Sequence, residues 1–493
     1  MLFISTKGED ELSLPSYEDE SPLSTPSKSK FRIRRAYVPP KPRRLFTVLC
    51  AFVGLAIIFH LSSHHTTRLD ANAYTQHKSP LQQPISQNET ITEQQYSPWV
   101  VGAPTQSFRD NLRSDVQYIT SWLSAGWNND VMTYMNLIYL GIITDRVPIV
   151  AMFVPMHIGT DAPPILFGDI FDVPRFTRES NIPLLEWYEV KDAASETWDD
   201  IGCWDVWEAV QYGDHFAKYS SLPERLRLDI SYTKAPEWIK MIPGYEHDKG
   251  ASFWSLARLA FPEDRNQNLG NIHSSPLHHT RLDPDEHLLC YDYLYYVGAQ
   301  VTSEYDFTYS PAWRSVGTFL HFTKSVEDVT RAYVNRALGL PQSAELPAYI
   351  TIHVRHGDFK DWCWDAEKFE DCFAPLSVIA RRVSEVQDEL LEQRSIHVPS
   401  SRVIMTSDET NPTWWADVAA RGWVRMDHDA MQTEERYGRW YPVILDAAIQ
   451  ASGVGFVGTD RSTFSILSRR RVLDWNNGVA RTVKWGKKGA DDH

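Results

Sequence analysis

The last third of the chain alternates helical patterns with short apolar runs that have the composition of buried strands. Residues 349–354 read YITIHV, residues 403–405 read VIM and residues 454–458 read VGFVG. Residues 376–391 and 441–451, which lie between these runs, have the apolar spacing of amphipathic helices. Helices that alternate with buried strands connect neighbouring strands as crossovers, so the pattern predicts a parallel sheet and an α/β fold.

Polar side chains follow each of the three predicted strands. His353, Arg355 and Asp358 come at the end of the first, residues 406–408 at the end of the second and residues 459–463 at the end of the third. The carboxyl ends of parallel strands open on one edge of a sheet, where open α/β folds bind their ligands. An arginine at that edge can hold a phosphate with a two-pronged hydrogen-bond fork. The alternative is a structural ion pair between Arg355 and Asp358 beside a core histidine.

Length and charge narrow the class of protein. At 493 residues the chain is long enough for two to three domains. The formal net charge is -15, although residues 28–44 hold eight basic side chains and no acidic one. General nucleic-acid binding requires a basic surface, so the acidic remainder of the chain argues against it. Residues 1–44 are rich in Ser, Pro and charge without periodicity, and we expect a disordered cytosolic tail there.

Residues 45–61 form an apolar run of about 17 residues, the lower limit for a helix that spans a bilayer. The basic cluster on its amino side predicts a cytosolic amino terminus and a lumenal bulk, as in a single-pass type II membrane protein. A short span suits the thinner membranes of the early secretory pathway, so we expect the Golgi or the endoplasmic reticulum. Residues 62–97 are polar and predict a lumenal stem that carries Asn88 as a glycosylation acceptor.

Four cysteines lie in the predicted lumenal part: Cys203, Cys290, Cys363 and Cys372. An even number in an oxidising compartment predicts two disulfides, most simply Cys363–Cys372 and Cys203–Cys290. Free buried thiols are the alternative. No C-x-x-C pattern or close Cys/His spacing indicates zinc, and we expect no metal site.

The amino-terminal half of the predicted globular part is less regular. A turn cluster at residues 124–130, SAGWNND, opens a helical pattern at residues 131–140, and residues 146–150 read as a strand. A glycine turn that opens a helix can bind an anion, because the first amide hydrogens lack partners and the helix dipole is positive there; an ordinary helix cap is the alternative. We interpret residues 98–330 as an α/β half with large insertions and residues 331–493 as a Rossmann-like second half.

Several segments carry a resemblance to a known family. HVRHGDF at residues 353–359, VIMTSDE at 403–409 and GFVGTDRSTFSILSRRR at 455–471 resemble, in this order and spacing, the signature segments of the GDP-fucose protein O-fucosyltransferase superfamily. Residues 126–128 and 167–173 are similar to segments in the other half of those enzymes. The resemblance implies a GT-B fold, in which two Rossmann-like halves face each other across a cleft, and an inverting reaction that generally needs no metal or other cofactor.

The resemblance also implies which residues bind the GDP-sugar donor: Gly126, Trp127, Asn128, His353, Arg355, Asp446, Thr463 and Phe464. It places Arg355 on the β-phosphate, Asp446 at the guanine edge, and Thr463 with Phe464 around phosphate. Fucosyl transfer builds positive charge on the sugar and leaves negative charge on GDP. A fixed guanidinium on the leaving phosphate therefore stabilises the transition state directly, which makes Arg355 the first candidate catalytic residue.

The chain departs from the family pattern at two positions. His356 stands where several relatives have a second arginine, and Ala125 stands where relatives that use a glutamate as general base place it. An alanine cannot accept a proton, which leaves the base open. Asp130 and Asp169 are the two candidates for that role, and Asn128 is a further candidate catalytic residue.

Together with the expected membrane topology, the resemblance implies inverting transfer of fucose from GDP-fucose to Ser or Thr of a protein acceptor in the secretory pathway. One alternative is a GDP-sugar transferase that acts on a glycan acceptor. Another is a catalytically silent membrane protein that keeps the nucleotide-sugar pocket, an idea suggested by Ala125. A metal-dependent GT-A transferase would need an Asp-x-Asp motif on a loop; residues 283–285 and 427–429 match by pattern, but neither follows a clear strand.

Overall fold

The computed structural model describes residues 96–492, except residues 160, 212, 303, 364, 365, 367, 369 and 370. The predicted cytosolic tail, the predicted membrane span at residues 45–61, nearly all of the predicted stem and its acceptor Asn88 lie outside the described residues. Among the helices that the structure describes, none combines the length and the hydropathy that a bilayer span requires.

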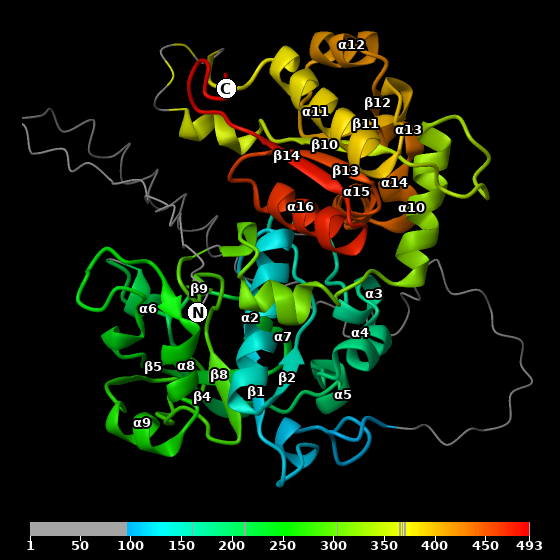
Figure 1. Ribbon diagram of the computed structural model, residues 1–493. Coiled ribbons are helices and arrows are strands. Elements are labelled where there is room, and N and C mark those ends of the chain that lie inside the picture. The colour runs from blue at the N-terminus through cyan, green and yellow to red at the C-terminus, as the bar shows by residue number, and fades with distance from the viewer. Residues whose placement is uncertain are drawn as a thin grey trace, which may run out of the picture. The chain divides into compact units, whose positions relative to one another are not determined.

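A seven-stranded sheet forms the centre of the amino-terminal half, with the strand order β3-β2-β1-β8-β4-β5-β7 (Figure 1). Neighbouring strands are parallel, apart from β7, which runs antiparallel to β5. The strands are β1 (Tyr118–Ser121), β2 (Val147–Val150), β3 (Leu185–Glu186), β4 (Asp199–Asp205), β5 (Leu228–Lys234), β7 (Ile272–His273) and β8 (Leu288–Tyr291). A small second sheet pairs β6 (Ala251–Ser252) with β9 (Val297–Gly298).

One long helix and several short ones accompany this sheet. The long helix is α2 (Trp127–Thr144), which follows β1. The short helices are α3 (Phe167–Ile170), α4 (Val173–Ser180), α5 (Trp187–Val190), α6 (Trp207–Val210), α7 (Leu222–Arg225), α8 (Phe253–Arg258) and α9 (Pro262–Gln267).

The carboxyl-terminal half contains a five-stranded sheet in the order β12-β11-β10-β13-β14, and all of its neighbouring strands are parallel. The strands are β10 (Ile350–Val354), β11 (Val403–Ser407), β12 (Val424–Arg425), β13 (Gly455–Thr459) and β14 (Val479–Val483). The helices are α10 (Lys324–Ala337), α11 (Leu376–Arg394), α12 (Pro412–Ala420), α13 (His428–Met431), α14 (Thr433–Tyr437), α15 (Tyr441–Ala451) and α16 (Thr463–Trp475).

The order of these five strands is that of a Rossmann-like sheet. Counted along the chain it is 3-2-1-4-5, so the direction of winding reverses between β10 and β13. The predicted parallel sheet is therefore confirmed. Ligands of such sheets bind outside the carboxyl ends of the strands on either side of this reversal. Here those ends carry His353 and Arg355 on one strand and Thr459 on the other.

Side chains alternate between the two faces of this sheet, and the alternation places the helices. Ile350, Ile352 and Val354 belong to a buried cluster that includes the apolar face of α11. Thr351 and His353 point to the opposite face, which α15 and α16 cover (Figure 1). Burial of each large apolar side chain contributes about 1.5–3 kcal/mol, which makes strands as short as five residues stable here.

Helix α2 continues past Gly141, where the sequence pattern predicted its end. A Cβ atom at Gly141 would lie 2.7 Å from Cγ of Pro148 and 2.9 Å from the carbonyl oxygen of Arg146. The glycine therefore allows the helix to approach β2 closely, and the helix ends three residues later, with Asp145 in the left-handed conformation.

The boundary predicted between residues 330 and 331 falls inside α10. Val329, Tyr333 and Val334 of this helix pack in a buried cluster with Tyr349 and with residues of α15. A helix whose core partners lie in the second half belongs to that half, so the second half begins at Lys324 rather than at residue 331.

The two halves contact each other through α15 and α16. Trp440, the residue before α15, donates an Nε1 hydrogen bond to the carbonyl oxygen of Pro163 at 2.7 Å. Trp313 donates one to the carboxylate of Asp474 in α16 at 2.5 Å. Helix α16 also packs against α2, so the helix that begins beside the polar strand ends is held from both halves.

Both predicted disulfides are present. Cys203 at β4 pairs with Cys290 at β8, and Cys363 pairs with Cys372 in the segment between β10 and α11. The first links two strands whose cysteines are 87 residues apart, whereas the second closes a short loop with a separation of 9.

Candidate functional site

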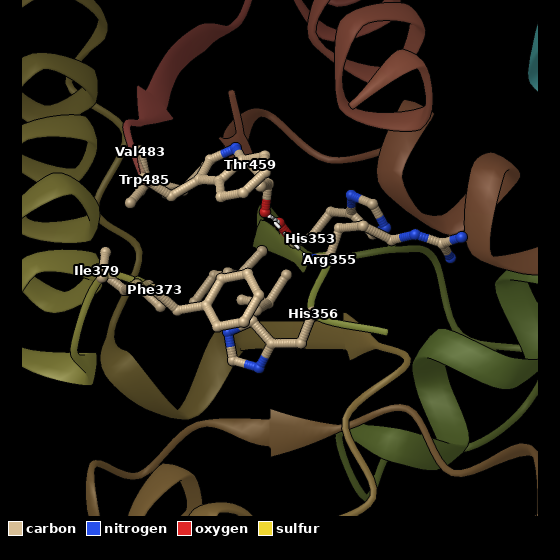
Figure 2. Close-up of a pocket in the computed structure, with 12 residues that line it drawn as sticks. His353, Arg355, His356, Phe373, Ile379, Thr459, Val483 and Trp485 are labelled. Atoms are coloured by element: carbon tan, nitrogen blue, oxygen red, sulfur yellow. Dashed lines mark hydrogen bonds between the residues drawn. The ribbon is translucent and has the colours of Figure 1, made fainter. Parts of the chain in front are cut away.

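His353 and Arg355 lie at the carboxyl end of β10, next to the reversal point of the sheet. They are two residues apart on an extended strand, so their side chains project from the same face. Figure 2 shows the imidazole and the guanidinium extending together, away from Phe373, Val483 and Trp485. Their common face is the one that α16 covers.

The Arg355 guanidinium sits between two carboxylates and remains reachable by solvent. Its Nε lies 2.8 Å from Oδ1 of Asp358, and its Nη1 lies 3.1 Å from Oδ2 of Asp408. The side chain is nevertheless 39% exposed. The backbone amide of Arg355 donates to Oγ1 of Thr459 at 3.0 Å, which ties β10 to the end of β13. The ion pair that the sequence offered as an alternative is thus present, and it holds a partly exposed cation.

His353 is buried and neutral. Its Nδ1 lies 2.8 Å from the hydroxyl of Ser465, and its ring stacks on Phe464 with 4.9 Å between ring centroids. Loss of water around the ring, with a smaller contribution from the positive charge of Arg355, lowers the pKa of His353 to about 3. At neutral pH the site therefore carries one cation, that of Arg355, and an uncharged imidazole beside it.

The amino terminus of α16 supplies two free amide hydrogens. Ser462 caps the helix by accepting a hydrogen bond from the amide of Ser465. Thr463 and Phe464 are the first two helical residues, and their amide hydrogens have no acceptor among the described residues. Unpaired amides at the positive end of a helix dipole favour an anion, and this helix has 13 residues to build the dipole.

The second predicted polar cluster contributes one side chain to the site. Thr406 is buried and structural, since its hydroxyl donates to the carbonyl oxygen of Ile352 and accepts from Nε2 of Gln450. Asp408 reaches Arg355 and also accepts a hydrogen bond from the amide of His356 at 2.8 Å. The sequence pattern alone did not show that Asp408 contacts Arg355 whereas Thr406 is structural.

A small hollow opens on the opposite face of the sheet, against α11. It encloses about 20 Å³, which is room for about one water molecule, and its walls are mostly apolar, with Phe373, Val483 and Trp485 among them (Figure 2). His356 borders it, stacks on Phe373 and pairs with Glu409 at 2.8 Å. The volume is far below that of a nucleotide site, so this hollow is no candidate for one.

Asp446, predicted at the guanine edge, lies in α15 and faces His428. Oδ1 of Asp446 lies 2.9 Å from Nε2 of His428, whose Nδ1 lies 3.0 Å from the hydroxyl of Thr433. Burial alone would lower the pKa of His428, but the negative charges of Asp446 and its neighbours raise it. Asp446 is about one quarter exposed, and His428 follows β12, so the pair stands at the same edge of the sheet.

In the amino-terminal half, the predicted turn opens α2 and is held by Asp130. Gly126 is the residue before the helix and makes no side-chain cap. Asp130 is 1% exposed, and its Oδ1 accepts hydrogen bonds from the amides of Ala125 at 3.0 Å and Ser124 at 3.3 Å. Burial raises the pKa of Asp130 well above its usual range. The carboxyl thus shapes the turn from inside the protein.

Trp127 and Asn128 differ in what they contact. The Trp127 ring stacks parallel to Phe171 at 6.2 Å between centroids, within the aromatic core of this half. Asn128 is 5% exposed, and neither its Oδ1 nor its Nδ2 has a hydrogen-bond partner in the described part of the chain. A buried amide without partners is costly, so Asn128 is the residue of this turn that most requires a ligand.

Asp169, the other candidate base, is exposed at the end of α3. The protein around it nevertheless removes enough water to raise the pKa of its carboxyl. Behind it, burial raises the pKa of Glu186 to about 7. Sequence reasoning missed Glu186, which is the last residue of the two-residue strand β3 and caps α5.

One group of three side chains has the spacing of metal ligands: Asp200, Asp229 and His278. Asp200 and Asp229 lie near the starts of β4 and β5, at the amino-terminal ends of these strands in the seven-stranded sheet. His278 binds Asp200 at 2.6 Å, and Asp229 accepts hydrogen bonds from Ser275 and the backbone. The two Asp-x-Asp triplets have structural partners: Asp285 in residues 283–285 pairs with Arg109, and Asp427 in residues 427–429 caps α13.

No protein-family model matches the chain, and no curated protein matches it in sequence. Among solved structures, the chain is similar to POFUT1 in complex with GDP-fucose, with 12% identity and a TM-score of 0.46 over 75% of this chain and 98% of that chain. The apo form of POFUT1 matches at 13% identity and 0.46 over the same shares. The fucosyltransferase NodZ from Bradyrhizobium matches at 11% and 0.34, over 72% and 93%. At these TM-scores the likeness by itself assigns neither fold nor function.

Proposed function

We propose that this chain is a glycosyltransferase that binds GDP-fucose at the carboxyl edge of its second sheet and transfers the fucose with inversion. The observation that carries the proposal is the partly exposed guanidinium of Arg355, which directly follows β10, together with the free amides of Thr463 and Phe464 after β13. Cation and amides stand at neighbouring strand ends, on either side of the reversal point. Together they offer hydrogen-bond donors to a diphosphate. The sequence resemblance supplies the identity of the sugar, fucose, and of the nucleobase, guanine.

Arg355 would act on the leaving group. In the transfer, the bond from the sugar C1 to the β-phosphate oxygen breaks, the acceptor oxygen forms the new bond to C1, and the acceptor loses its proton. Negative charge then collects on GDP, and a fixed guanidinium lowers its energy without reorganisation. Removal of such a group typically costs about 100-fold or more in rate.

We further propose a GT-B arrangement, in which the turn at residues 124–130 faces the donor from the amino-terminal half. The unpaired amide of Asn128 supports this, because a phosphate oxygen could accept from its Nδ2 and a sugar hydroxyl could donate to its Oδ1. No metal or other cofactor enters the proposed reaction. Of the two candidate bases, Asp169 is the one that solvent and an acceptor reach, since Asp130 is occupied inside the turn.

The proposed acceptor is Ser or Thr of a protein in the secretory pathway. The two disulfides support an oxidising compartment such as the lumen of the endoplasmic reticulum or the Golgi, in keeping with the type II membrane topology expected from residues 28–61. A second function, silent binding of a nucleotide sugar, is favoured by one observation: Ala125 has no group that could take a proton.

Product formation from GDP-fucose distinguishes these functions. We expect the full chain to release GDP and fucosylate a folded protein substrate, and Arg355→Ala to reduce this at least 100-fold. Fucosylation of free glycans but not of protein would assign the glycan acceptor. If the chain binds GDP but modifies neither acceptor and forms no GDP from GDP-fucose, it is a binding protein.

A further inference from the structure

The hydroxyl of Ser465 is the one polar side-chain group that hydrogen-bonds the imidazole ring of His353 within the part of the chain that the structure describes. Ser465 lies in the first turn of α16 and is 4% exposed. Its Oγ has two hydrogen-bond partners. The backbone amide of Thr459 donates a hydrogen bond to Ser465 Oγ at 3.0 Å. The second neighbour is Nδ1 of His353, 2.8 Å from the same oxygen.

These two contacts determine where the protons lie. A hydroxyl has one hydrogen to donate and two lone pairs to accept with. The Thr459 amide can only donate, so it occupies one lone pair of Ser465 Oγ. Within the described residues, the hydroxyl hydrogen then has one acceptor in reach, the Nδ1 of His353. In a neutral imidazole one nitrogen accepts and the other carries the hydrogen, so the hydrogen of His353 is on Nε2.

The surroundings of the ring favour this neutral form and fix its plane. Burial and the positive charge of Arg355 both lower the pKa of His353 and so disfavour the imidazolium form, in which both ring nitrogens carry a hydrogen. The stacking of the ring on Phe464 limits its rotation. Thr459 reinforces the same arrangement, because its hydroxyl donates to the carbonyl oxygen of His353 at 3.0 Å.

We propose that Ser465 is a positioning residue that fixes His353 as an Nε2–H donor toward an anionic oxygen of the bound diphosphate, beside Arg355. This inference rests on the proposed function for the ligand, whereas the tautomer itself is a property of the free protein. With the hydrogen on Nε2, the strand ends present only donors to the anion: guanidinium, imidazole and helix amides. With the hydrogen on Nδ1, the imidazole would turn a lone pair toward the phosphate and repel it.

Ser465→Ala tests this, with Ser468→Ala as the matched control. Ser468 lies one turn further along α16, is fully buried, and its hydroxyl has no hydrogen-bond partner among the described residues. Both variants remove one hydroxyl from the same helix, but only the first removes a bond to His353.

The first measurement is the ¹⁵N spectrum of the ligand-free full chain labelled at its 17 histidines, with the His353 signals identified by their loss in His353→Gln. We expect the Nε2–H pattern in the wild type and in Ser468→Ala, and a mixture of tautomers in Ser465→Ala. An Nδ1–H pattern in the wild type, or an unchanged pattern in Ser465→Ala, would overturn the proposal.

The second measurement is GDP affinity by calorimetry at temperatures well below unfolding. We expect Ser465→Ala to bind GDP roughly tenfold more weakly, as for the loss of one hydrogen bond to a charged group, and Ser468→Ala to bind like the wild type. Equal affinity in all three proteins would contradict the role toward the anion. A wild type that does not bind GDP at all would instead overturn the proposed function, while the tautomer measurement would still decide the role of Ser465.

Discussion

Under the proposed function, Asp358 is expected to weaken the binding of the GDP-sugar donor at Arg355. Its carboxylate occupies the Nε edge of the guanidinium at 2.8 Å and is 62% exposed. A phosphate would use the remaining donors of the same guanidinium, so the two anions would stand roughly 6 Å apart. Asp358→Asn removes one negative charge from this site and keeps a side chain of the same shape.

The expected magnitude follows from Coulomb's law. Two unit charges about 6 Å apart repel by roughly 0.7 kcal/mol in water and by about twice that at a half-exposed site. We therefore expect Asp358→Asn to bind GDP about fivefold more tightly at low salt, because roughly 1 kcal/mol corresponds to that ratio. At about 1 M salt the Debye length falls to about 3 Å, so the gain should largely disappear.

Calorimetric titration with GDP at low and high salt measures this effect. Asp361→Asn is the matched control, because Asp361 lies on the same short 3-10 helix (Asp358–Trp362) and makes no ion pair with Arg355 in the described structure. Weaker binding by Asp358→Asn would refute the reasoning and show that Asp358 orients Arg355 for the phosphate. A gain of equal size in both variants would show that the effect comes from the net charge of the protein and not from the contact between Asp358 and Arg355.

Two further predictions concern stability. Loop-closure entropy predicts that replacing Cys203 and Cys290 by Ser costs about 4.6 kcal/mol of unfolding free energy, given their separation of 87 residues. Replacing Cys363 and Cys372 should cost about 2.6 kcal/mol, given their separation of 9, and equal losses in urea titrations would contradict this. The pKa of His353 is about 3 when folded and 6.5 when unfolded, so its contribution to stability is complete above pH 6.5 and declines toward pH 3. Wild type should lose roughly 2 kcal/mol more than His353→Gln between pH 7.5 and 5, and parallel losses would refute the assignment.

The carboxyl-terminal half could be predicted from sequence because its signals are local. The three predicted strands, β10, β11 and β13, are apolar runs bounded by polar residues, and the helix at residues 441–451 has the bounds that its periodicity indicates. Strands β12 and β14 were not predicted, because neither is an apolar run. The pairing of the four cysteines followed from their number and from the short spacing of Cys363 and Cys372. For the same reason the polar strand ends converge as expected, since β10, β11 and β13 are adjacent and parallel.

Much of the amino-terminal half could not be predicted, because its strands depend on distant partners. β4 reads DDIGCWD and is buried nearly throughout, although polar residues begin and end it. Its last residue, Asp205, is fully buried next to Asp292 at the end of β8, and burial with the charge of Asp292 raises the pKa of Asp205 to about 9. Two carboxyl groups that hold one proton between them cannot be recognised from residues 87 positions apart.

The candidate site shows the same division. Sequence placed Arg355 and the pair Thr463 and Phe464 at neighbouring strand ends, because strand boundaries are local, but it did not predict the helix that begins at Thr463. It did not identify Asp408 as a partner of Arg355 or Ser465 as a partner of His353. These contacts join residues 53 and 112 positions apart. Several hydroxyls and carboxylates lie nearby in the sequence, and nothing local distinguishes the ones that make the contacts.

The most direct test of the account is the affinity of the full chain for GDP and UDP, measured by calorimetry without added metal. We expect GDP to bind more tightly than UDP, and Arg355→Ala to weaken GDP binding at least 100-fold, because Asp358 and Asp408 would then face the diphosphate without a cation. Arg402→Ala, an exposed arginine just before β11, should bind GDP like the wild type. Unchanged GDP affinity in Arg355→Ala, or a preference for UDP, would contradict the assignment of a GDP-sugar site to these strand ends.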